Sequence, residues 1–257
     1  MTLPGPWGRE DCRPSASSSR KRCRIFETGS SGNHSCLDDH MADVNAVMVS
    51  THLDDAVFSA TDVLNTSTLV VTVFAGIPDG RFVGSWDDTC GASDSRKVMR
   101  DRRQEDEAAL SRYGCRFVHM DFLGGQYVTG HRKRESLIER IAMALQSHCR
   151  GPVDVYAPAG IGHPEHADVR DAALRVRPDA TLYADLPYAA RARARPVALP
   201  RAVAWTGRSK RDAALSRSAF RLKLRAVKCY ASQIRTIELA FPGLLTEQML
   251  GKEVYWS

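Results

Sequence analysis

The chain has 257 residues, 43% of them apolar and 26% charged, which excludes a disordered or fibrous protein and suits one sizeable catalytic domain. The net charge of +6 comes mainly from residues 20–24 and 191–225, and these cations are not regularly interleaved with aromatic residues. We therefore predict a solvated basic face and no nucleic-acid site, with an acidic substrate or a membrane surface as the alternative partner.

The N-terminal segment differs in composition from the rest of the chain. Residues 1–40 are rich in Ser, Gly, Pro and Arg without apolar periodicity, so they are predicted to be a disordered extension preceding a domain at 41–257. Met41 would itself begin a complete domain, which leaves open whether the extension belongs to the native protein. The start lacks an apolar signal-peptide core, no run reaches the roughly 20 apolar residues of a membrane span, and the seven cysteines form no CxxC pair. These features predict a cytoplasmic protein with reduced thiols.

From residue 46 onward, strand-like and helix-like segments alternate. The expected strands are Ala46–Ser50, Leu69–Phe74, Arg116–Met120, Val153–Tyr156 and Thr181–Ala184. The expected helices begin near Asp55 and span Ser95–Tyr113, Ser136–His148, Glu165–Arg175 and a basic segment from about Ser218 to Leu239. Long loops are expected at 76–94 and 189–201. This alternation predicts an α/β fold, a Rossmann-like three-layer sandwich with a mostly parallel sheet.

Two strands of this pattern end in polar motifs. The first strand runs into His52, Asp54 and Asp55, and a later one runs through Gly160 and Gly162 into a helix start that carries His163 and His166. The carboxyl ends of parallel strands meet at one edge of a sheet, which is where α/β proteins place their sites. An Asp at a helix start is more often an N-cap, and a lone His is more often structural, so each motif alone is weaker than the pair.

Together the two motifs supply the donors of a catalytic zinc site. Such a site has three protein ligands and one open position, so His52, Asp55 and His166 complete it. Asp54 and His163 then remain, the first to take a proton from the attacking water and the second to stabilise the oxyanion or protonate the leaving amine. The expected chemistry is metal-dependent hydrolysis.

The motifs THLDDAV and GHPEH resemble those of the PIG-L (LmbE-like) N-acetylglucosaminyl deacetylases. The likeness extends from residue 44 to about 257 and includes an R-x-x-E-x-x-x-A-x-x-x-x-G motif at 102–114, YADLPYA at 183–189 and YASQ at 230–233. Leu53, Ala56 and Glu165 depart from the commonest family residues, which are Pro, Glu and Asp at these positions. These departures point to the subgroup of teicoplanin-type glycopeptide pseudoaglycone deacetylases.

The resemblance implies the same zinc ligands, the same base and the same role for His163. It also implies that Arg102 and Glu105 hydrogen-bond sugar hydroxyls, a pair that would otherwise be interpreted as an exposed helical ion-pair stripe. Asp87 is predicted either to reach the sugar or to lie in a solvated turn. Asp185 and Tyr188 either orient a histidine or make simple loop contacts.

The predicted function is zinc-dependent removal of the N-acetyl group from an N-acetylglucosaminyl glycoconjugate, such as a glycopeptide-antibiotic pseudoaglycone. One alternative is deacetylation of a small N-acetylglucosaminyl-inositol thiol precursor. A second is a non-catalytic Rossmann-like binding module, although no G-x-G-x-x-G follows the first strand. The physiological metal, the aglycone, the preference for acetyl over longer acyl groups and the oligomeric state are left open.

Overall fold

The computed structural model describes residues 43–80, 82–130, 132–193 and 207–257. The predicted extension at residues 1–40 lies outside these ranges, as does most of the second predicted loop.

A seven-stranded sheet forms the centre of the described structure, in the order β3-β2-β1-β4-β5-β7-β6. Five strands are parallel: β1 (Ala46–Ser50), β2 (Thr68–Thr72), β3 (Arg116–His119), β4 (Asp154–Pro158) and β5 (Thr181–Tyr183). Two C-terminal strands complete the sheet in antiparallel pairings, β6 (Lys210–Ala214) and β7 (Lys252–Trp256). The sheet is therefore mostly parallel, as predicted.

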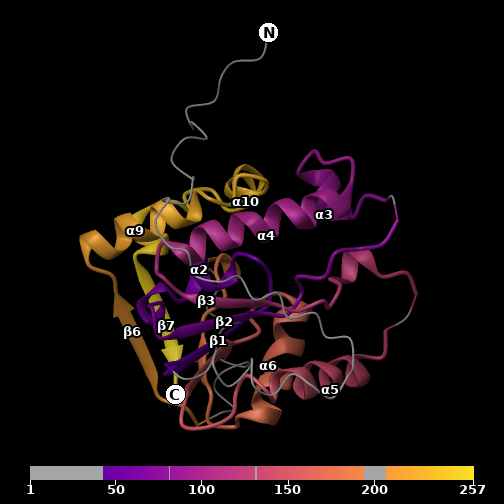
Figure 1. The fold of residues 1–257 in the computed structure, drawn as a ribbon. Coiled ribbons are helices and arrows are strands. Elements are labelled where there is room, and N and C mark those ends of the chain that lie inside the picture. The colour runs from indigo at the N-terminus through magenta and orange to yellow at the C-terminus, as the bar shows by residue number, and fades with distance from the viewer. Residues whose placement is uncertain (1–42, 81, 131, 194–206) are drawn as a thin grey trace.

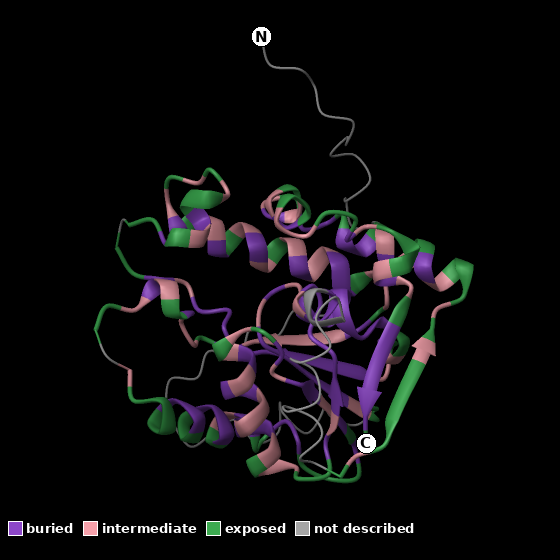
Figure 2. Ribbon diagram, turned by 180° about the vertical axis from the view of Figure 1, so that it is seen from behind, coloured by how far each residue is buried: buried purple, intermediate pink, exposed green. Residues whose placement is uncertain are grey.

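Helices cover both faces of the sheet, as Figure 1 shows. One layer contains α2 (Asp55–Ser59), α4 (Ser95–Ser111) and α9 (Arg217–Val227), while α5 (Arg134–Leu145) and α6 (Pro164–Val176) form the other. The central strands β1 and β2 between them are buried (Figure 2), and Val47, Met48 and Val49 of β1 are fully inaccessible. A strand enclosed on both faces needs a continuous apolar run rather than alternation, which is why this strand was readable from the sequence. The predicted three-layer α/β sandwich is confirmed.

Shorter elements complete the domain: η2 (Thr61–Val63), α3 (Ser85–Thr89), η3 (Gly125–Tyr127), α7 (Tyr188–Arg193), α10 (Ile234–Ala240) and α11 (Glu247–Leu250). Two predictions need correction here. The segment 76–94 is not entirely loop, since it contains α3, and the basic helix expected from about Ser218 to Leu239 is two helices, α9 and α10. Between them the chain turns so that Tyr230 and Ser232 bind acidic side chains of α4, a set of tertiary contacts that helical periodicity cannot reveal.

The order of the strands positions the functional site. The chain builds β1, β2 and β3 outward in one direction and then returns to place β4 on the other side of β1. At such a reversal the crossover connections diverge, and open α/β sheets place their ligand sites there, in this chain at the carboxyl ends of β1 and β4. The loops that carry the two polar motifs follow these two strands.

No helix among the described residues is both long and apolar enough to cross a membrane. No disulfide joins the cysteines in this part of the chain, which are Cys90, Cys115, Cys149 and Cys229.

Candidate metal-dependent active site

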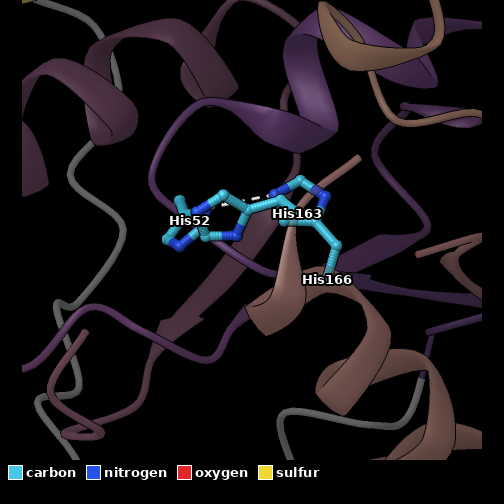
Figure 3. A group of neighbouring side chains, drawn as sticks. All are labelled: His52, His163 and His166. Atoms are coloured by element: carbon cyan, nitrogen blue, oxygen red, sulfur yellow. Dashed lines mark hydrogen bonds between the residues drawn. The ribbon is translucent and has the colours of Figure 1, made fainter. Parts of the chain in front are cut away.

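The paired motifs lie together at the carboxyl ends of β1 and β4. His52 lies in the turn after β1, and His163 and His166 lie at the start of α6, with their three imidazole rings gathered in one place (Figure 3). The ring centroid of His52 is 5.2 Å from that of His163 and 5.1 Å from that of His166. The structure therefore unites residues that are more than a hundred positions apart in the sequence.

Local sequence explains how α6 presents its histidines. Gly160 and Gly162 both have positive φ angles, 77° and 74°, a conformation that residues with a Cβ rarely adopt. A Cβ at Gly162 would also lie 3.0 Å from Cβ of Tyr188. The chain then turns into the helix at Pro164, whose fixed φ suits the first helical position. This turn places His163 at the N-cap of the helix and His166 in its first turn.

Three side-chain atoms form a compact triangle. His52 Nδ1 and His166 Nε2 each lie 3.3 Å from Asp55 Oδ2, and the two nitrogens are 3.2 Å apart. Ligand atoms bound tetrahedrally to zinc at about 2.0–2.1 Å are separated by about 3.3–3.4 Å. The donor types and their spacing therefore fit a zinc ion held by these three residues, the set expected from the sequence.

His163 offers a second way to complete a metal-binding group. One ring nitrogen from each of His52, His163 and His166 lies within 4.8 Å of the other two. This 4.8 Å limit is wider than the spacing expected around zinc. The atoms of the triangle that includes Asp55 already have the expected spacing, which favours the triangle over the three-histidine group.

Two further carboxylates fix the orientation of the ligating histidines. Glu165 Oε2 lies 2.8 Å from His52 Nε2, and Asp185 Oδ1 lies 2.7 Å from His166 Nδ1. Each contact occupies the ring nitrogen that faces away from the triangle, which leaves the inner nitrogen to accept a metal ion. Asp185 Oδ2 in turn accepts a hydrogen bond from the backbone N–H of Ile161, 2.7 Å away.

The sequence pattern did not predict the contact between Glu165 and His52. Glu165 follows Pro164 at the start of α6, a position where an acidic residue is expected for helix stability alone. Its second oxygen, Oε1, accepts from the backbone N–H of Gly125 at 2.5 Å, so the side chain connects η3 to the site. The position of Glu165 between two histidines could have indicated this contact, because its long side chain can reach back toward the neighbouring strand.

Asp54 and His163 lie beside the triangle without joining it. Burial and the negative charge of Asp55 raise the pKa of Asp54 to about 7, opposed by the positive charges of His52 and Arg102. Burial and the positive charges of His52 and His166 together lower the pKa of His163 to about 4, so its ring is neutral near pH 7. The Nδ1 atom of His163 is buried and has no hydrogen-bond partner among the described residues. An unsatisfied buried nitrogen at this position is free to contact a ligand.

Asp87 and Arg102, two of the predicted sugar-binding residues, form an ion pair with each other. Asp87 is fully buried, and its Oδ1 lies 2.9 Å from Arg102 Nη1. Its Oδ2 accepts from Ser95 Oγ at 2.5 Å and from the Tyr127 hydroxyl at 2.9 Å. The solvated-turn alternative for Asp87 is therefore wrong. Arg102 keeps unused donor capacity, because its buried Nε has no partner in the described structure.

Glu105 is also engaged within the protein. Its two carboxylate oxygens accept from the backbone N–H and from the hydroxyl of Ser232, each at 2.7 Å. Arg102 is only 5% exposed and Glu105 bonds to a distant segment, so the alternative of an exposed ion-pair stripe is wrong for this pair.

Tyr188 packs against both histidines of the second motif. Its ring centroid lies 5.5 Å from that of His163 and 5.3 Å from that of His166, and Phe241 covers its other side at 5.9 Å. The ring thus forms an apolar wall that limits the positions of both imidazoles.

The fold and the site can be compared with known proteins. No protein-family model matches the chain, and no curated protein matches it. Among solved structures, the A40926 pseudoaglycone deacetylase Dbv21 is similar, with 28% sequence identity and a TM-score of 0.67 over 83% of this chain and 96% of that one. A deacetylase of the teicoplanin biosynthesis pathway, in complex with bog, gives 25% identity and a TM-score of 0.66 over 82% and 96% of the two chains.

The same architecture also occurs with a different activity. The 4-carboxy-2-hydroxymuconate hydratase GalB from Pseudomonas putida KT2440 is 17% identical, with a TM-score of 0.50 over 83% of this chain and 95% of that one. At this identity the likeness concerns the fold alone. The choice of reaction therefore has to be argued from the side chains at the carboxyl edge of the sheet.

Proposed function

We propose that this protein is a hydrolase that removes the N-acetyl group from an N-acetylglucosaminyl glycoconjugate. Its fold and its paired motifs resemble those of the PIG-L (LmbE-like) deacetylases. The observation that carries this proposal is the triangle of His52 Nδ1, Asp55 Oδ2 and His166 Nε2, with Asp54 and His163 beside it. Hydrolysis of an amide needs an activated water, a base for its proton and a group that stabilises the oxyanion. The five residues can supply all three requirements.

His52, Asp55 and His166 are the proposed zinc ligands. Two imidazoles and one carboxylate are a donor set that zinc accepts in catalytic sites, and their separation suits it. When bound there, zinc lowers the pKa of water toward neutrality and polarises the acetamide carbonyl. Glu165 and Asp185 hold the two imidazoles in the orientation that this requires.

Asp54 is the proposed general base. It is adjacent in sequence to the ligand Asp55, and its Oδ2 accepts a hydrogen bond from Gln233 at 2.9 Å, which leaves its Oδ1 to face a water molecule. Asp54 accepts one proton of the water while the water oxygen bonds to the acetyl carbon. The proton then passes to the nitrogen as the carbon–nitrogen bond breaks, so the products are acetate and a free amine. A general base of this kind contributes about 10²–10⁴-fold to the rate.

His163 is proposed to stabilise the oxygen of the acetyl group as it acquires negative charge. Its ring lies 5.2 Å from that of His166 and is held by Tyr188, so it is fixed beside the reaction centre. A neutral imidazole has one N–H donor, and the absence of a described partner for Nδ1 means that no protein acceptor competes at that atom.

The proposed substrate class is a glycopeptide pseudoaglycone. Support comes from the 28% identity with a deacetylase of the A40926 pseudoaglycone and from the buried Arg102, whose unpartnered Nε is a donor suited to a sugar oxygen. Asp87 supports the same contact indirectly by pairing with Arg102 and holding its guanidinium. The small inositol-linked thiol precursor is the competing substrate within the same reaction class.

A direct assay distinguishes these substrates. The zinc-loaded protein would be incubated with an N-acetylglucosaminyl glycopeptide pseudoaglycone and, separately, with N-acetylglucosaminyl inositol, and each product followed by mass spectrometry with and without a chelator. Chelator-sensitive loss of acetyl from the pseudoaglycone is the expected result. Loss from the inositol glycoside alone would reassign the substrate, and loss from neither, with zinc bound, would contradict the proposed function.

A further inference from the structure

The turn between α9 and α10 contacts three acidic side chains through the hydrogen bonds of three of its residues. We call residues 230–233 the YASQ turn. The Tyr230 hydroxyl donates to Asp106 Oδ1 at 2.8 Å, and the N–H and hydroxyl of Ser232 donate to Glu105. Gln233 then donates from Nε2 to Asp54 Oδ2 at 2.9 Å. The turn therefore connects α4 to the proposed general base.

The α4 end of this connection is firmly held. Tyr230 is fully buried and its ring packs 6.2 Å from that of Phe58 in α2, while Asp106 is 2% exposed and also lies 2.8 Å from His119 Nε2. Both carboxylate oxygens of Glu105 accept hydrogen bonds from Ser232, two residues after Tyr230. The carboxylates of the adjacent residues Glu105 and Asp106 on α4 thus fix the position of the turn.

The Gln233 end is equally well defined. Its side chain is only 6% exposed, and its Nε2 faces two acceptors, Asp54 Oδ2 at 2.9 Å and the Leu53 carbonyl at 3.4 Å. Because both neighbours accept hydrogen bonds, the amide must present its NH₂ group to them rather than its oxygen. Gln233 is therefore a donor to Asp54, and unlike Lys or Arg it brings no charge into the metal site.

We propose that Gln233 is a positioning residue for Asp54, held in register by Glu105 and Asp106 through the YASQ turn. This inference rests on the proposed function, in which Asp54 is the base. A donor on Oδ2 fixes the rotation of the carboxylate and directs the remaining lone pairs of Oδ1 toward the water. Glu105 then acts on catalysis through Ser232 and Gln233, which explains why both of its oxygens face the protein.

The test replaces Gln233 with Met, which keeps the length of the side chain but cannot donate, and with Glu, which is of equal size and lacks the N–H donors when ionised. Gln104→Met, at an exposed position of α4, is the matched control. In the zinc-loaded full chain we expect both Gln233 variants to lower kcat by about 10- to 100-fold with KM within about twofold of wild type. Zinc content and Tm should match those of the control.

A readout independent of turnover is the orientation of the Asp54 carboxylate in crystal structures of wild type and Gln233→Met. A rotated or disordered carboxylate supports the proposal, and an unchanged carboxylate overturns it even if wild type deacetylates none of the substrates tried. Wild-type kcat in both variants would also overturn it, as would a rise in KM alone, which would make Gln233 a substrate contact. If Gln233→Met does not fold, Ser232→Ala should give a smaller loss of kcat with unchanged KM, and an unchanged kcat there would count against the turn.

Discussion

Buried carboxylates occupy two regions of this molecule, and their surroundings differ. Glu253 in β7 accepts from five donors: the backbone N–H and hydroxyl of Thr61, the backbone N–H of Asp62, the Tyr255 hydroxyl and the ammonium of Lys223. At the carboxyl edge of the sheet, Asp54 has a single described side-chain donor, Gln233, and lies beside the like charge of Asp55.

A charge buried for structure and a charge buried for function differ in how completely the protein itself satisfies the hydrogen-bonding groups around them. Around Glu253 every acceptor site is filled from within the protein, so the cluster ties β7, α9 and η2 together and needs no ligand. At the edge, Asp55 Oδ2 lies 3.3 Å from two imidazole nitrogens, and His163 Nδ1 has no partner in the described ranges. Unfinished networks of this kind cost folding free energy unless a ligand completes them. Five predictions test this distinction.

Removal of a metal ligand should have the largest effect. His166→Ala deletes one corner of the triangle, and the two remaining donors cannot hold zinc at a three-ligand site. We expect zinc content by elemental analysis and deacetylase activity both to fall to background. A chelator should do the same to wild type, and added zinc should restore wild type but not the variant. Full activity in zinc-free protein would contradict the metal site.

Replacement of the base should separate chemistry from metal binding. Asp54→Asn keeps the shape of the side chain but cannot accept the proton, so kcat should fall by about 10²–10⁴-fold while bound zinc is retained. Asp88→Asn, at an exposed position of α3, serves as the control and should leave kcat unchanged. Near-normal turnover by Asp54→Asn would remove Asp54 from the mechanism.

Disruption of the Glu253 cluster should affect stability and leave the chemistry intact. Glu253→Gln leaves the Lys223 ammonium buried without its counter-charge, and breaking a buried ion pair in this way costs about 3–5 kcal/mol. Urea unfolding at pH 7 should report this loss, whereas Glu238→Gln on the surface of α10 should change little. Kinetics measured on the folded fraction should match wild type.

The same cluster gives a pH dependence with a definite sign. Burial alone would raise the pKa of Glu253, but the Lys223 charge and the hydrogen bonds from Lys223, Thr61 and Asp62 outweigh it and lower that pKa below its ordinary value. A lowered pKa in the folded state means that the carboxylate contributes its full stability above about pH 4.3. The difference in unfolding free energy between wild type and Glu253→Gln should shrink as the pH falls below that value toward the folded-state pKa. A constant difference between pH 7 and pH 3 would show that folding does not lower the pKa of Glu253.

The outer carboxylate of the metal site should have the smallest effect. Asp185→Asn keeps an oxygen near His166 Nδ1 but removes the charge that orients the ring, so zinc affinity should fall by about 10–100-fold. Competition with a chromogenic chelator measures this change. Asp179→Asn, at an exposed position, provides the comparison. An unchanged affinity would limit Asp185 to its contact with the Ile161 backbone.

The sequence by itself determined the parallel part of the fold and the members of the candidate metal triangle. An apolar run such as Ala46–Ser50 is typical of a strand that is buried on both faces. His52, Asp55 and His166 lie in the segments that follow two parallel strands, and the carboxyl ends of these strands must meet at one edge of the sheet. The tertiary structure alone decided which side chains complete the site. Glu165 reaches back to His52, Asp87 turns inward to Arg102, and the YASQ turn interrupts a helical pattern to bring Gln233 to Asp54. These contacts join residues 15 to 179 positions apart and are set by packing between elements, which leaves no periodic trace in the chain.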